Sequence, residues 1–366
     1  MKKGSWFIIG ISVVIFVSLW LKSNIVSISD VSIKNAVGEK LHLSDSETEK
    51  TTLHFSKKMI TSISSISVEG ENIDLIELKQ FSGLHHLTIE PSVLSKEEPK
   101  YSINITGLDV LENMNGVKEV QIIYAKNIEH PGVFKNVKVL SLYYCGISNT
   151  DELSQCIELE ELYLCSEVDD YSFLKEMVNL KVLEISANDD TFDFQLLQYL
   201  PNLERLDLKG ITLEQDEFEL ICKYNKKLQA LYIYNGNLEN INNIDNLSDL
   251  NALYLIDCDV ENAEPLKTLH ELKVLNISGN PLCYEDFQNI CIYNRGLKQL
   301  FCSNTEIKRI DAIISLNELE DLDVSNCGIK DVRVLSSLDH IKTLVIDESS
   351  GAKEQLKEAN IAVYYE

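Results

Sequence analysis

Nine cysteines and seven histidines are the residues in this sequence best suited to metal binding or catalysis. A zinc site favours paired cysteine spacings such as C-x-x-C, and no such pair occurs. The histidines are scattered, and no Ser/His/Asp or Cys/His arrangement follows from their positions. Neither a glycine-rich dinucleotide motif nor a P-loop is present. The sequence therefore predicts no catalytic, metal or cofactor site, and it argues against an enzyme.

Tyrosines and charged residues suggest a different chemistry, the recognition of another macromolecule. Tyrosine offers a large contact area and a hydroxyl group at low entropic cost. Two aromatic groups flank a charged group along the chain. The predicted binding residues are Tyr143, Tyr144, Tyr163, Glu184, Asp207, Lys209, Tyr232, Tyr234, Tyr254 and Phe301. The alternative is that these aromatic residues only stabilise a sheet through cross-strand packing.

An apolar-x-apolar motif determines where these residues lie. It occurs 13 times at steps of about 22 residues, from Ile66/Val68 to Leu344/Ile346. Its period of two is typical of a half-buried strand, so the middle residue points away from the core. One such unit cannot bury its own apolar side chains, whereas stacked units can. The sequence therefore predicts a solenoid whose outward-pointing residues form columns across neighbouring strands.

A small polar residue recurs three positions after the second apolar residue, as at Cys145, Cys258 and Cys327. The stretch "LEDLDVSNCGIKDVRVLSSLDHIKTLVI" resembles the leucine-rich repeat, L-x-x-L-x-L-x-x-(N/C)-x-(I/L). The 22-residue step and the I-x-x-I turn resemble the bacterial, internalin-like type. The resemblance implies an α/β solenoid, a curved right-handed horseshoe or arc. A parallel sheet would line the concave face, short helices or 3-10 turns the convex face, and the Asn or Cys would satisfy backbone groups of the loops.

The same pattern accounts for most of the cysteines. Those at the Asn/Cys position, together with Cys222, Cys291 and Cys302, are expected inside the core. Cys165 is instead expected to project from a strand on the concave face. Metal binding or a functional disulfide remains the alternative for these thiols.

Four regions follow from these patterns. Asp30 is placed to cap the N-terminus of a helix that buries Val31, Ile33 and Val37, and a second short helical piece is expected at 55–60. The regions are 1–24, a signal-anchor or transmembrane segment; 25–60, a linker and helical cap; 61–350, about 13 repeats with an inserted loop at 91–102; and 351–366, a C-terminal cap.

Two repeats of 25 residues differ from the rest. Residues 216–235 match residues 285–304 at a separation of 69 residues, with Phe218, Cys222 and Asn225 mapping onto equivalent residues. The extra residues predict a full helix on the convex side of each unit.

The N-terminus predicts membrane attachment. Lys2 and Lys3 precede 18 uncharged residues from Gly4 to Leu21, near the minimum needed to span a bilayer. Leading lysines favour a cytoplasmic N-terminus. We therefore expect a single-pass protein of the cell membrane, attached through this helix only, with its C-terminal part extracytoplasmic. A cleaved signal with secretion, or a buried core helix, is the alternative.

The formal charge of −25 makes nucleic acid an unlikely partner, because such a surface repels phosphate backbones. The sequence thus predicts a non-enzymatic module on the bacterial cell surface that binds a protein on its concave face. Two alternatives stay open. Tyrosine rings also stack on sugars, so the ligand would then be a glycan or the cell wall. Otherwise, the solenoid would be a scaffold without a specific concave ligand.

Overall fold

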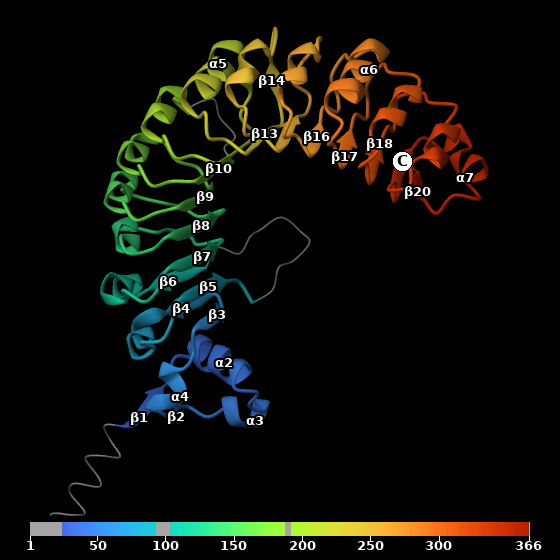
Figure 1. Cartoon of the computed structure of the whole chain (residues 1–366). Coiled ribbons are helices and arrows are strands. Elements are labelled where there is room, and N and C mark those ends of the chain that lie inside the picture. The colour runs from blue at the N-terminus through green and yellow to red at the C-terminus, as the bar shows by residue number, and fades with distance from the viewer. Residues whose placement is uncertain (1–23, 93–102, 187–191, 366) are drawn as a thin grey trace, which may run out of the picture. The chain divides into compact units, whose positions relative to one another are not determined.

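The computed structural model describes residues 24–92, 103–186 and 192–365. The chain divides into two compact units, Met1–Leu159 and Glu160–Glu366. Each unit is built from the same repeat of a strand, a turn and a return segment that is mostly a 3-10 helix (Figure 1). The apolar side chains of strand and return segment meet between them, and this line of contacts is the core.

The first unit begins with a cap of short elements. Asp30 accepts a hydrogen bond from the backbone N–H of Ile33 at 2.9 Å, so the predicted helix start is confirmed. Ile33 and Val37 are buried, but Val31 is exposed, contrary to expectation. The cap comprises β1 (Ile25–Ile28) and β2 (Leu53–Ser56), which pair antiparallel, with α2 (Val31–Lys40), α3 (Asp45–Thr48) and α4 (Lys57–Thr61).

The helical piece expected at 55–60 is wrong at its start. Phe55 lies on β2 with its side chain buried, and the helix begins only at Lys57. The stretch from Leu53 to Ser56 alternates buried and exposed side chains, the pattern of a strand. Ser56 then caps the helix by accepting from the N–H of Met59.

The repeats of the first unit form a parallel sheet. Its strands are β3 (Ser65–Glu69), β5 (His86–Glu90), β7 (Glu119–Ile123) and β8 (Val139–Tyr143). A shorter parallel pair is formed by β4 (Asn72–Asp74) and β6 (Asn104–Thr106). The return segments are η1 (Leu75–Gln80), η2 (Leu108–Asn113), η3 (Pro131–Phe134) and η4 (Thr150–Gln155). Most of the loop predicted at 91–102 lies outside the described residues.

The second unit contains a longer parallel sheet, with strands on the inner side of the bend and helices on the outer side (Figure 1). Its strands are β9 (Glu161–Cys165), β10 (Val182–Ser186), β11 (Arg205–Lys209), β13 (Ala230–Ile233), β15 (Ala252–Leu255), β16 (Val274–Asn276), β17 (Gln299–Phe301), β18 (Asp321–Asp323), β19 (Thr343–Ile346) and β20 (Ala362–Tyr365). A short parallel pair, β12 (Leu213–Glu214) and β14 (Gly236–Asn237), lies beside it.

Both 25-residue repeats carry a full helix, as predicted. These helices are α5 (Gln215–Tyr224) and α6 (Tyr284–Tyr293). A short helix α7 (Ala352–Gln355) precedes the last strand, in the order expected for the C-terminal segment. The other return segments of the second unit are η5 (Ser172–Glu176), η6 (Phe194–Tyr199), η7 (Asn242–Asn246), η8 (Glu264–Thr268), η9 (Asp311–Ser315), η10 (Arg333–Ser337) and η11 (Glu348–Ser350).

The Asn or Cys that recurs after several strands satisfies the backbone of the loops. Asn280 donates to the carbonyls of Leu255 and Ile277, while its own oxygen accepts from the N–H of Cys258 at 3.1 Å. The thiol of Cys327 donates to the carbonyl of Cys302 at 3.0 Å. Buried backbone groups must find such partners, so this role of the Asn/Cys position is confirmed.

The predicted membrane segment, residues 1–24, lies almost entirely outside the described residues. Among residues 24–92, 103–186 and 192–365, no helix has both the length and the apolar character to cross a bilayer.

Candidate binding surface

Strand register gathers most of the predicted residues on the concave face of the second unit. Glu184 is paired in register with Asp207, and Asp207 with Tyr232. The row continues through Tyr254 to Asn276. Because side chains alternate along each strand, these middle residues all point away from the leucine core. The predicted column is therefore confirmed as a set of neighbours.

A buried charged network occupies β10 and β11. Lys209 Nζ donates to Glu184 Oε1 at 2.7 Å and lies 3.7 Å from Asp207 Oδ2. Arg205 donates to the same Asp207 oxygen at 3.1 Å. Glu184 is 6% exposed and Asp207 only 1%, although both stand on the open face of the sheet. Buried carboxylates are costly unless they are paired, and these two cations supply the pairing.

The pKa shifts in this network reflect its burial. Loss of water raises the pKa of Asp207, although the hydrogen bond from Arg205 and the charge of Lys209 oppose that change. Burial also acts to lower the pKa of Lys209, but its contacts with Glu184 and Asp207 outweigh that effect and raise it. Both pKa values are thus raised, which disfavours the charged form of Asp207 and favours that of Lys209, because the carboxylate is far more buried than the ammonium. Asp207 Oδ1 and Arg205 Nε have no hydrogen-bond partner within the described residues.

An aromatic stack continues from this network. The rings of Tyr232 and Tyr254 stack with centroids 4.6 Å apart and planes inclined by 27°. The guanidinium of Arg205 lies 4.7 Å from the centre of the Tyr232 ring, within the range of a cation–π interaction. Burial raises the pKa values of Tyr234 and Tyr254, so both hydroxyls stay protonated and able to donate hydrogen bonds. All three tyrosines remain partly exposed, which leaves ring surface available for contact.

Phe301 lies further along the same face. It is in register with Asn276 on one side and Asp323 on the other, and it is partly exposed. The structure therefore places Phe301 two strands from Tyr254, with the small side chain of Asn276 between them.

The remaining predicted tyrosines, Tyr143, Tyr144 and Tyr163, lie outside the Tyr232–Tyr254 stack. Tyr163 belongs to the second unit and donates its hydroxyl to Glu161 at 2.8 Å. Tyr143 and Tyr144 belong to the first unit. Tyr144 is 64% exposed and stacks on Tyr124, with centroids 5.0 Å apart and planes inclined by 13°.

The backbone at both rings of that pair is unusual. Tyr124 has φ of 60° and Tyr144 has φ of 56°, in the left-handed region. Equivalent loop positions in other repeats carry residues that tolerate this conformation, such as Gly279 and Asn326. A tyrosine there is strained, and in this conformation the two rings stack on each other.

Sequence reasoning missed one residue of the charged network and the burial of another. Arg205 was missed, although strand alternation puts it two residues before Asp207 on the same face. Cys165 projects on the concave face as expected, since its sulfur lies 3.4 Å from Glu184 Oε1, but it is buried there. Burial and the negative charge of Glu184 raise the pKa of this thiol to about 12, so it stays neutral.

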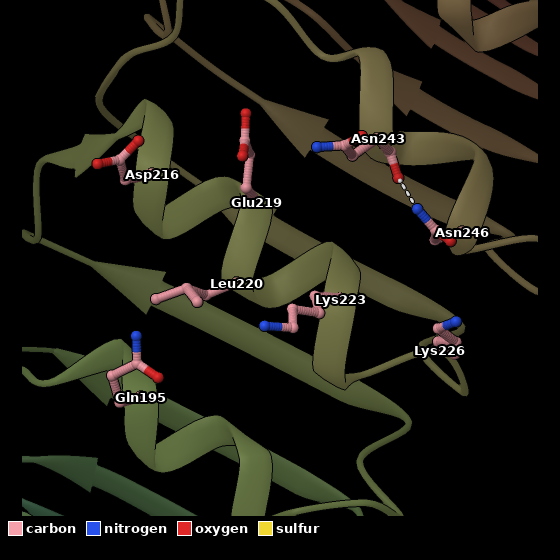
Figure 2. Close-up of a pocket in the computed structure, with 8 residues that line it drawn as sticks. All are labelled: Gln195, Asp216, Glu219, Leu220, Lys223, Lys226, Asn243 and Asn246. Carbon is pink, nitrogen blue, oxygen red and sulfur yellow. Dashed lines mark hydrogen bonds between the residues drawn. The ribbon is translucent and has the colours of Figure 1, made fainter.

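A cavity on the helix side of the second unit offers a different environment. It has a volume of about 540 Å³ and is lined by side chains of η6, α5 and η7 (Figure 2). Figure 2 shows Glu219, Leu220 and Lys223 along α5, with Gln195 and Asn243 on neighbouring segments. Its charged side chains are exposed to solvent, and it holds no aromatic ring. The concave sheet face, with its stacked tyrosines and paired charges, is therefore the better candidate for a binding surface than this cavity. Within the described residues, no cluster of His, Cys, Asp or Glu is arranged to hold a metal ion.

No protein-family model matches the sequence, and no curated protein does. Solved structures do match. An internalin (inlF) from Listeria monocytogenes superposes with a TM-score of 0.59 at 20% identity, over 86% of this chain and 94% of its own. The functional domain of InlJ from the same organism, which includes a cysteine ladder, gives 0.51 at 13% identity, over 86% of this chain and 79% of its own.

A third match comes from a plant. The peptide hormone receptor RGFR1, solved in complex with RGF2, gives a TM-score of 0.51 at 16% identity. The match covers 79% of this chain and 48% of the receptor chain. Together with the parallel sheets, these matches show that the chain has the leucine-rich repeat fold and that internalins are among its structural neighbours.

Proposed function

We propose that this chain is a non-enzymatic interaction protein that binds another protein on the concave face of its second unit. The observation that carries the proposal is the Arg205–Tyr232–Tyr254 stack beside the buried Glu184 and Asp207 carboxylates. Tyrosine and arginine are enriched among residues that dominate binding energy at protein interfaces. A network that fixes their side chains before binding lowers the entropic cost of association.

The structural neighbours support the same class of function. The plant peptide hormone receptor RGFR1, which this chain resembles in fold, was solved in complex with RGF2. A partly exposed aromatic stack on this fold therefore fits binding better than it fits catalysis.

We further propose that the repeats lie outside the cytoplasm of a bacterial cell, attached by residues 1–24 or released after cleavage. The support is the uncharged stretch from Gly4 to Leu21 behind Lys2 and Lys3. Treatment of intact cells with a protease tests this location. Degradation of the repeats while a cytoplasmic marker stays whole is the expected result, and protection of the repeats until the cells are lysed would contradict it.

A glycan ligand is the second candidate, and one observation favours it. The stacked, strained Tyr124–Tyr144 pair presents a ring face that is largely exposed. Such a platform suits the apolar face of a sugar. Binding of protein-free cell-wall polysaccharide that is lost in Tyr144→Ala would favour this reading over a protein partner.

Capture of partners from cell-surface and host extracts tests the main proposal. The bait is the full chain, compared with the variant Tyr232→Ala/Tyr254→Ala. A matched control is Tyr199→Ala/Tyr293→Ala, which removes two exposed rings from helices of the other side. We expect a protein retained by the wild type and the control but lost by the first variant. A partner kept equally by all three, or no protein captured by any, would refute the proposal.

A further inference from the structure

We propose that the concave face between β15 and β18 takes an extended polypeptide segment with an aromatic side chain and, two positions away, a lysine or arginine. This inference rests on the proposed function and names the chemistry of the partner. The segment is fixed by two adjacent features of the surface, an aromatic gap and a group of carboxylates that form no ion pair.

The aromatic gap lies over β16. Asn276 stands in register between Tyr254 and Phe301. Its side-chain oxygen accepts from the N–H of Ser278 at 3.0 Å, so the amide is held close to its own strand. Neighbouring strands are about 4.8 Å apart. A ring placed above Asn276 would thus lie at about 4.8 Å from each neighbour, within the range of stacked aromatic pairs.

Small side chains stand next to this gap. The residues two positions after the middle column on β16 to β18 are Ser278, Ser303 and Ser325, all buried. On β13 and β15 the same positions carry Tyr234 and Ile256, which are larger and partly exposed. No bulky side chain at these positions therefore obstructs a peptide chain whose aromatic side chain enters the gap.

The negative charge lies on the far side of Phe301. Asp323 is in register with Phe301 and accepts hydrogen bonds from the N–H and hydroxyl of Ser325. Asp321 accepts from the amide of Gln299, and Asp347 from the N–H of Asn326. Within the described residues none of the three forms an ion pair with lysine or arginine, unlike Glu184 and Asp207.

This contrast indicates which charge the partner brings. Where the concave face carries buried acids on β10 and β11, the same sheet supplies the cations. On β18 and β19 no lysine or arginine forms an ion pair with these partly exposed carboxylates, although Lys342, which pairs with Glu320, lies near enough to attract Asp321. A cation from the partner would complete this part of the surface, and the adjacent ring of Phe301 adds a cation–π contact.

The spacing fixes the position of the basic residue. From β16 to β18 the distance is two strand spacings, about 9.6 Å. In an extended segment, side chains two positions apart lie on one face about 6.7 Å apart. The long side chain of lysine or arginine covers the remaining ~3 Å, whereas a residue one position away would point to solvent. The surface does not favour one chain direction, so the motif is aromatic-x-basic or its reverse.

Binding of fluorescent heptapeptides to the full chain tests the inference. The probes are acetyl-Gly-Ser-Phe-Ser-Lys-Ser-Gly-amide and its reverse, a version with glutamate for lysine, and a version with alanine for phenylalanine. We expect one of the first two to bind at least about tenfold more tightly than the glutamate version and about threefold more tightly than the alanine version.

Variants separate the specific effect from general attraction to an acidic protein. Asp321→Asn/Asp323→Asn should reduce the preference for lysine over glutamate to about threefold or less. Asp216→Asn/Glu219→Gln on the helix-side cavity changes the net charge equally and should leave it unaltered. Phe301→Ala should reduce the preference for phenylalanine over alanine, because the peptide ring would then have only Tyr254 to stack on.

Equal binding of the lysine and glutamate peptides would overturn the inference. An equal effect of the two charge-neutralising variants would do the same. If a tyrosine-dependent protein partner is nevertheless captured, the proposed function stands and only this description of the partner fails. If no such partner exists, the proposed function itself fails.

Discussion

Lys209 is the side chain that allows two carboxylates to be buried on an open sheet face. It contacts both Glu184 and Asp207, and its own side chain is 40% exposed. Removing one partner of a buried pair leaves an uncompensated charge. The partial exposure of Lys209 lets water screen part of that cost.

We therefore expect Lys209→Met to lower the free energy of unfolding by about 1–2 kcal/mol, measured by urea denaturation. The double variant Lys209→Met/Glu184→Gln should recover part of the loss. Lys342→Met, which breaks the exposed ion pair with Glu320, is the control and should change stability by less than about 0.5 kcal/mol. If Lys209→Met and Lys342→Met lowered the free energy of unfolding equally, burial of the Lys209 contacts would add nothing to stability.

The same network predicts a pH dependence. Burial raises the folded-state pKa of Asp207 above its ordinary value of 3.8, so its contribution favours the folded state at low pH and is lost as the pH rises through the raised pKa. Lys209→Met removes an attraction that holds this pKa down. Its deficit relative to wild type should therefore shrink as the pH falls from about 7 to about 5. A deficit that grows on acidification would contradict this assignment.

The cysteines provide a test of core packing at single residues. Burial raises the pKa values of Cys156, Cys222 and Cys258 to about 12, whereas Cys283 is the exposed thiol. Because the thiolate is the reactive form, one thiol per chain should react quickly with a disulfide reagent at about pH 8. All nine should react after denaturation, and Cys283→Ser should remove the fast phase. Several fast thiols in the native protein would show that the repeats open readily.

At the scale of the elements, the hydrophobic period predicted the strands and their register. The first member of each predicted apolar pair lies on a strand, because stacking leaves only one register that buries every leucine. The two full helices also followed from sequence, since their repeats have three extra residues. The start of α4 did not, because Phe55 was assigned to the helix although it belongs to the buried positions of β2.

The candidate site was less predictable for physical reasons. Strand alternation fixes which face a residue occupies, but not how far its side chain reaches across to other strands. The burial of Glu184 and Asp207 depends on how Arg205 and Lys209 fold over them. The pairing of Tyr144 with Tyr124 depends on a left-handed backbone after each strand, which favours glycine or asparagine rather than tyrosine.

Each of the two full helices is linked to the preceding repeat by hydrogen bonds from an asparagine at its C-terminus. Asn225 ends α5 and donates to the carbonyls of Leu197 and Leu200 at 3.2 and 3.1 Å. Asn294 ends α6 and makes the equivalent pair of bonds 69 residues later. The internal repeat seen in the sequence thus preserves the same two hydrogen bonds from an asparagine side chain to backbone carbonyls.

Asn225→Ala should lower the free energy of unfolding by about 1–3 kcal/mol, because two carbonyls lose their donor in a buried place. Asn294→Ala should have a similar effect. Asn246→Ala removes an exposed amide that donates within its own segment, and its effect should be below about 0.5 kcal/mol. Thermal or urea denaturation measures all three. A neutral result at Asn225 would mean that water replaces the amide.

At the scale of the whole molecule, the charge of −25 makes association with a basic partner a long-range process. Attraction between exposed charges extends about 10 Å at 0.1 M salt and about 3 Å at 1 M. Such attraction speeds encounter, while the dissociation rate depends on contacts already formed.

For a partner captured through the concave face, we expect the association rate constant to fall at least about tenfold between these salt concentrations. The dissociation rate constant should change by less than about threefold. Surface plasmon resonance measures both. An association rate that rises with salt would identify an acidic partner and would exclude a basic segment as the group that meets Asp321 and Asp323.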